Sequence, residues 1–136
     1  MTRHRIPSAT LTALLGLGVT LAPAPSRAQE AAGDPAAGQR VFNQCRACHI
    51  IDNNKRNSVG PNLHGVFGRP AASIEGFRYS QTMKDKAAGG LVWTEENLRA
   101  YIKQPKEVVP GGSMSYPGMR NEQQLNDLIA FLKTQA

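Results

Sequence analysis

Two cysteines and a histidine stand close together in the segment C-R-A-C-H, residues 45–49, and they include the only cysteines of the chain. The pattern C-x-x-C-H is the attachment signature of a c-type haem. On a helix, side chains three residues apart lie on the same side, so the thiols of Cys45 and Cys48 could both form thioethers along one haem edge. The imidazole of His49 could then bind the iron as an axial ligand.

The same residues admit three other interpretations. Cys45 and Cys48 could form a disulfide in an oxidising compartment. A thioredoxin-like redox motif would require a strand-helix-strand context, which the flanking sequence lacks. A zinc site would require more cysteine or histidine ligands at close spacing. The motif by itself permits all of these sites, and its helical surroundings favour haem attachment.

The first 28 residues have the pattern of a secretory signal peptide. Two arginines precede an uncharged apolar run at residues 9–22, and a small-x-small triplet follows at residues 26–28. The apolar run is shorter than the roughly 20 residues that span a hydrocarbon core, which argues against an uncleaved membrane anchor. We therefore expect residues 1–28 to be removed, and residues 29–136 to form one small periplasmic domain without a membrane span.

The charge of the chain excludes some classes of partner. The formal net charge is +6, and three arginines but no acidic residue belong to the predicted leader. Removal of the leader would leave a mildly basic domain without the dense Lys/Arg runs of a nucleic-acid binder. A small positive excess is better suited to docking on acidic proteins than to binding phosphates.

Four stretches have helical patterns, and none alternates long enough to predict a sheet. Asp34 and Pro35 are typical of a helix start, and Pro105 limits the end of the third helix. The last helix is the clearest, because its leucines and isoleucine recur at helical spacing from residue 125 to residue 132. The predicted helices run from 34 to about 47, from 80 to 89, from 94 to 105, and onward from about 121.

Long loops leave little material for an apolar core. Residues 50–76 and 105–120 are rich in Gly, Pro and Asn, and the whole chain has one tryptophan, three tyrosines and four phenylalanines. Loops of this length in a small domain usually have a function. A buried haem would fill the missing centre of an all-α fold.

Taken in order, the motifs of residues 33–133 resemble those of class I cytochromes c of the mitochondrial and short bacterial type. The resemblance implies the cytochrome c fold, in which a small helical domain wraps around one covalently attached haem and its first and last helices cross. The matching positions are Gly38 and Phe42, G-P-N-L-H-G at 60–65, F-G-R at 67–69, G-F-R-Y at 76–79, W-T-E-E at 93–96, Tyr101, P-G-G-S-M at 110–114, and Leu128 and Phe131.

The resemblance also implies that Met114 is the second axial ligand. A thioether is a soft, neutral donor that raises the reduction potential of a haem. Three other residues compete for this role. Met83 is expected to fill the core, Met119 follows in a second Pro-Gly turn and is the serious rival, and His64 lies on the surface in related proteins.

Further roles follow from the resemblance alone. The carbonyl of Pro61 is expected to accept a hydrogen bond from His49, which would fix the tautomer of the ligand. Arg69, Tyr79 and Trp93 are expected to donate hydrogen bonds to the haem propionates, because a buried carboxylate without partners is costly.

The function implied is that of a monomeric, periplasmic electron carrier that shuttles single electrons between redox proteins and is not an enzyme. The family's ring of lysines around the haem edge is thinned here, although Lys106 remains. A haem enzyme or gas sensor would need an open iron position. The sequence is also compatible with a subunit of a dehydrogenase or reductase complex, and with a disulfide-stapled binding module without cofactor.

Overall fold

The computed structural model describes residues 32–136, which form a helical domain. Within this range there is no β-strand, and the one β-bridge joins Pro70 to Val92. The expected all-α fold is confirmed. The predicted signal peptide lies outside the described residues. The elements are α1 (Pro35–Val41), the 3-10 helix η1 (Phe42–Gln44), α2 (Gln81–Ala88), α3 (Glu95–Lys103), α4 (Pro105–Val108) and α5 (Glu122–Lys133).

Helix α1 begins as predicted but ends earlier. The side chain of Asp34 accepts a hydrogen bond from the backbone N–H of Ala36 at 2.8 Å, and Pro35 occupies the first helical position. After Val41 the chain tightens into η1, and the N–H of Cys45 donates to the carbonyl of Phe42 three residues back. The predicted helix to residue 47 is therefore too long, because the α-helical hydrogen bonds give way to 3-10 turns.

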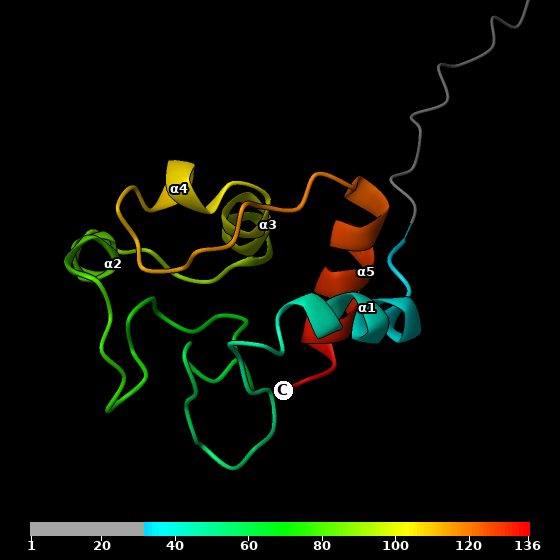
Figure 1. The fold of residues 1–136 in the computed structure, drawn as a ribbon, viewed down its shortest axis with the longest axis horizontal. Coiled ribbons are helices and arrows are strands. Elements are labelled where there is room, and N and C mark those ends of the chain that lie inside the picture. Colours follow the sequence, from blue (N-terminus) through cyan, green and yellow to red (C-terminus); the bar gives the residue numbers. More distant parts are fainter. Residues whose placement is uncertain (1–31) are drawn as a thin grey trace, which may run out of the picture.

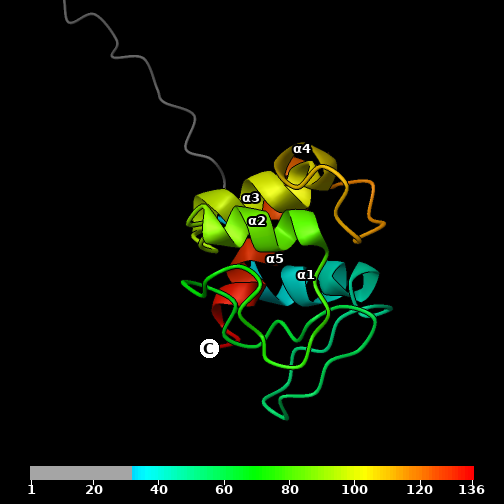
Figure 2. The same cartoon turned by 90° about the vertical axis from the view of Figure 1, so that its left-hand side faces the viewer.

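Helices α1 and α5 cross each other, as Figures 1 and 2 show. The crossing is close because position 38 is glycine: a Cβ atom there would lie 2.5 Å from the carbonyl carbon of Asp127 and 2.7 Å from the Cβ of Phe131. Beside this point the rings of Phe42 and Phe131 pack with their centroids 5.5 Å apart. The expected crossing of the first and last helices is confirmed.

The other predicted helices start at side-chain caps. Ser80 accepts from the N–H of Met83 at the start of α2, and Thr94 accepts from the N–H of Asn97 at the start of α3, both at 3.2 Å. Helix α4 was not predicted, since it falls in the stretch expected to be a loop. Its four residues are too few to show helical periodicity, and Pro105, which was expected only to limit α3, occupies its first turn.

Helix α5 supplies much of the core. Its predicted apolar face is buried, with Leu125, Leu128 and Ile129 each 1 % exposed and Leu132 4 % exposed. Asn121 caps the helix by accepting from the N–H of Gln124 at 2.9 Å. In the part of the chain described here, no helix is both long and apolar enough to cross a membrane.

Candidate haem site

One cavity of about 380 Å³ brings together residues that are far apart in the sequence. Its wall is mostly apolar, and it is formed by η1, the long loop after it, α2, α3, the loop that follows α4, and α5. Every residue that was predicted from the sequence to bind the haem or its iron borders this cavity. These residues are Cys45, Cys48, His49, Arg69, Tyr79, Trp93 and Met114.

The two thiols are separated by a single turn of chain. The N–H groups of Cys48 and His49 both donate to the carbonyl of Cys45, at 3.0 and 2.9 Å, so the motif closes one helical turn. Cys45 is partly buried and Cys48 is exposed, and both are free thiols. Burial, with a smaller effect of Cys48, raises the pKa of the Cys45 thiol from 9.0 to about 11. Both residues border the cavity, one helical turn apart.

One ring nitrogen of His49 is tied to the neighbouring loop by a hydrogen bond. Its Nδ1 donates to the carbonyl oxygen of Pro61 at 2.8 Å, as the resemblance implied. Burial lowers the pKa of His49 below its ordinary 6.5, and the hydrogen bond to Pro61 acts in the opposite direction. A proton on Nδ1 leaves the lone pair of Nε2 available to a metal.

Gly60 allows the loop to approach the imidazole ring. A Cβ atom at this position would lie 2.7 Å from Nδ1 of His49, which no side chain tolerates. The N–H of Gly60 donates to the carbonyl of Cys48 at 2.7 Å and ties the loop to the motif. The glycine at this position is therefore required by close packing against the expected iron ligand.

Three partly or fully buried donors lie elsewhere on the cavity wall. Arg69 donates to the carbonyls of Asn62 and His64 at 2.9 and 3.0 Å, and these two bonds leave other guanidinium N–H groups for a carboxylate. The hydroxyl of Tyr79 accepts from the N–H of Ile74 at 3.3 Å and keeps its own proton to donate. Trp93 is 8 % exposed. This donor set fits the two carboxylates of a haem.

The methionines fall into different surroundings. Met114 is partly buried and borders the cavity. Met119 is 4 % exposed in the core, its N–H donates to the carbonyl of Ile102, and it does not border the cavity. Met83 is 8 % exposed and borders the cavity from α2. Of the two loop methionines, only Met114 is therefore placed to reach a group inside the cavity.

Two residues on the cavity wall, Gln44 and Tyr116, were not predicted from the sequence. The hydroxyl of Tyr116 donates to Oε1 of Gln44 at 3.4 Å and joins the methionine loop to η1. Burial raises the pKa of Tyr116, with a smaller contribution from Cys45. The signal available in the sequence was the position of this tyrosine, two residues after Met114.

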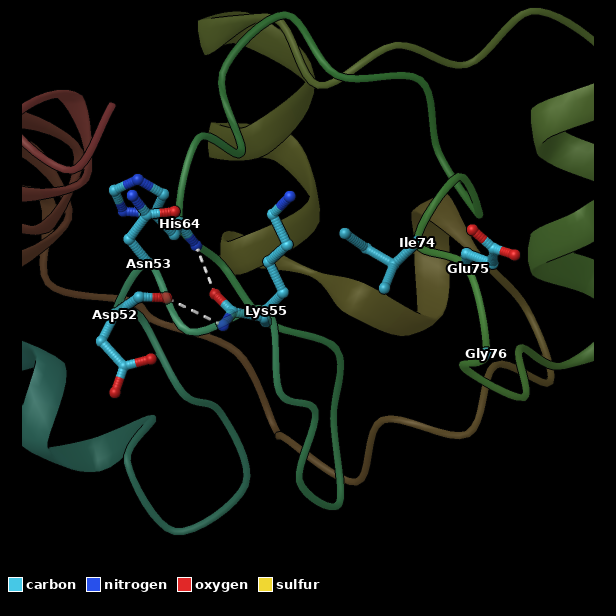
Figure 3. Close-up of a pocket in the computed structure, with 8 residues that line it drawn as sticks. Asp52, Asn53, Lys55, His64, Ile74, Glu75 and Gly76 are labelled. Carbon is cyan, nitrogen blue, oxygen red and sulfur yellow. Dashed lines mark hydrogen bonds between the residues drawn. The ribbon is translucent and has the colours of Figure 1, made fainter.

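A second, more open cavity of about 500 Å³ lies outside this site (Figure 3). Figure 3 shows that Asp52, Lys55 and His64 border it on one side and Ile74 and Glu75 on the other. Neither cysteine borders it, and no group of three or more metal-ligating side chains occurs among residues 32–136. His64, which was expected on the surface, is partly buried and belongs to this cavity.

The sequence matches known cytochromes c over most of its length. The family model for cytochrome c matches residues 35–136. Cytochrome c2 of Blastochloris viridis is 47 % identical over 110 residues, which are 81 % of this chain and 84 % of that protein. Cytochrome c-550 of Ancylobacter novellus is 47 % identical over 100 residues, which are 74 % of this chain and 94 % of the other.

Solved structures show the same likeness. Cytochrome cH from Methylobacterium extorquens has a TM-score of 0.68 and 39 % identity, and the match covers 75 % of this chain and 99 % of the other. Cytochrome c2 from Rhodospirillum centenum has a TM-score of 0.71 and 36 % identity, with 76 % and 99 % covered. The chain therefore belongs to the cytochrome c family, whose members carry one covalently attached haem c.

Proposed function

We propose that the protein is a periplasmic monohaem cytochrome c that shuttles single electrons between redox proteins. The observation that carries the proposal is the convergence of both motif cysteines, His49 and Met114 on one largely apolar cavity. Cys45 and Cys48 would hold the haem through thioethers, and its iron would supply one-electron redox chemistry. His49 and Met114 would bind the iron.

In this proposal the side chains orient the haem and set its reduction potential, and they do not themselves change oxidation state. The bond from His49 to Pro61 fixes the tautomer and orientation of the imidazole. Met114 supplies a soft, neutral donor that favours the reduced iron. Arg69, Tyr79 and Trp93 would donate hydrogen bonds to the propionates, and the apolar wall would limit the access of water to the haem.

The position of Met114 favours a carrier over a haem enzyme or gas sensor. Enzymes and sensors need an open iron position for their ligand, whereas a thioether from Met114 would close it. A permanent subunit of a redox complex would use the same site and differ only in the lifetime of its association.

We propose that residues 1–28 are a signal peptide removed during export. The basic start, the apolar run and the small residues Ser26 and Ala28 support this. N-terminal sequencing of the native holoprotein should begin at Gln29. A bulky Ala28→Phe substitution should block cleavage, whereas Ala22→Phe should leave it intact. A mature holoprotein that retains Met1 would show that the leader is not cleaved.

The electron-transfer role is tested by the rate of reduction by a purified acidic redox protein. Lys106 is exposed on α4, and the resemblance places it near the haem edge. The rate should fall as ionic strength rises, because salt screens the attraction between exposed charges. Lys106→Glu should slow reduction at low salt.

Arg40→Glu is the matched control. Arg40 is also exposed, and it lies on α1, whereas Lys106 lies on α4. Arg40→Glu changes the net charge by the same amount as Lys106→Glu. If the position of the charge directs docking, Arg40→Glu should slow reduction less than Lys106→Glu does. Equal effects of the two substitutions would show that net charge alone directs the encounter. A reduction rate that changes neither with ionic strength nor on Lys106→Glu substitution would contradict electrostatic docking.

A further inference from the structure

The peptide group between Pro61 and Asn62 is hydrogen-bonded at both its carbonyl and its N–H. Its carbonyl oxygen accepts from Nδ1 of His49 at 2.8 Å, and its N–H donates to Oδ1 of Asn57 at 2.9 Å. The peptide bond is trans and planar, so these groups point in opposite directions from one rigid unit. Asn57 and His49 therefore act on the same peptide from opposite sides.

The side chain of Asn62 anchors the loop around this peptide. It is 4 % exposed, and its Nδ2 donates to the carbonyls of Asp52 and Arg56, both at 3.0 Å. Its Oδ1 accepts from the N–H of His64 at 2.8 Å. The bonds to Asp52 and His64 are the dashed lines of Figure 3. Pro61 has no N–H of its own, so the direction of its carbonyl depends on its neighbours.

A hydrogen bond at one end of a peptide changes its strength as a partner at the other end. When an N–H donates, the carbonyl of the same peptide becomes more polarised, and coupled bonds strengthen each other by roughly 10–30 %. A stronger acceptor draws the Nδ1 proton of a histidine ligand and raises the basicity of its other nitrogen. Greater electron donation to iron favours the oxidised state and lowers the reduction potential.

We propose that Asn57 is a positioning residue that lowers the reduction potential of this cytochrome through the Pro61–Asn62 peptide and His49. The inference rests on the proposed role of His49 as an iron ligand. Asn57 does not border the haem cavity, and its bond to the Asn62 N–H connects it to the peptide that holds His49.

The test compares two asparagines of one loop in the holoprotein. Asn57→Ala removes the acceptor from the peptide N–H. The reduction potential should become more positive. The His49 Nδ1 proton should exchange with solvent about fivefold faster, which is the fold-change expected when the loop loses the neutral hydrogen bond from the Asn62 N–H to Asn57. Asn54→Ala is the control, because Oδ1 of Asn54 accepts from the N–H of Arg56 at 2.9 Å and does not touch the peptide. It should change neither quantity.

Aspartate substitutions complete the test and stay informative if Asn57→Ala fails to fold. Asn57→Asp keeps the acceptor and makes it stronger, so the potential should fall further than in Asn54→Asp, which adds the same charge nearby. The Nδ1 proton should stay at least as protected as in the unaltered protein.

Two outcomes would overturn the proposal: equal potentials in each Asn57 variant and its Asn54 counterpart, or a more negative potential in Asn57→Ala. Failure of the proposed function looks different. If His49 is not a ligand, the spectrum of the unaltered holoprotein will lack the signature of histidine-ligated haem, whatever residue stands at 57.

Discussion

Met114→Ala should convert a closed, low-spin iron site into one that binds carbon monoxide when reduced. Met114 borders the haem cavity, and we propose that it is the second iron ligand, so its truncation should leave that position to water or an external ligand. Loss of the thioether should also lower the reduction potential, because a soft donor that favours the reduced iron is gone. Absorption spectra with and without carbon monoxide, together with voltammetry, measure both effects.

Met119→Ala is the matched control for ligation. Met119 is buried in the core away from the cavity, so its truncation should cost about 2–5 kcal/mol of folding stability and leave the low-spin spectrum intact. If Met119→Ala loses low-spin character and Met114→Ala keeps it, the axial ligand is Met119. If the unaltered protein binds carbon monoxide rapidly, the simple carrier function is wrong, and an enzyme or sensor becomes the better hypothesis.

Gly38→Val should destabilise the whole domain by separating α1 from α5. Even a Cβ at this position would overlap the backbone of Asp127, and a backbone cannot move aside by changing rotamer. We expect a loss of about 3 kcal/mol or more in the free energy of unfolding, a large part of the roughly 5–15 kcal/mol that is typical of a domain. Denaturant unfolding of the holoprotein measures this loss.

Ala36→Val on the same helix separates packing from helix propensity. Ala36 is exposed, so valine there should cost only about 0.5 kcal/mol. If both valines destabilise the protein equally, the close approach at Gly38 does not control stability.

Local signals in the sequence predicted the parts of the fold that local chemistry determines. Asp34, Ser80, Thr94 and Asn121 mark helix starts, and each accepts the capping hydrogen bond that its residue type suggests. Helix α4 and the switch to η1 are too short for periodicity to reveal. Their conformations depend on packing against the rest of the domain.

Residues of the candidate site could be predicted where a motif, or the order of family-like segments along the chain, pointed to them. The C-x-x-C-H motif identified the thiols and His49 directly, whereas Arg69 and Met114 came only from the order of segments along the chain. The contacts of Asn57 and Tyr116 were not predicted. Tyr116 joins positions 72 residues apart, and Asn57 bonds to a residue five positions further along the same irregular loop. Asparagine and tyrosine are too common in loops for their type to signal either contact.

The crossing of α1 and α5 also determines the order in which the molecule can be assembled. One of its hydrogen bonds, from the N–H of Asp34 to the carboxylate of Asp127, joins residues 93 positions apart. Contacts of such high sequence separation must close a long loop and form slowly. A chain that emerges from its N-terminus presents residues 45–49 before residues 122–133 have appeared. The segment with both cysteines is therefore made before α1 can pack against α5 and complete the core.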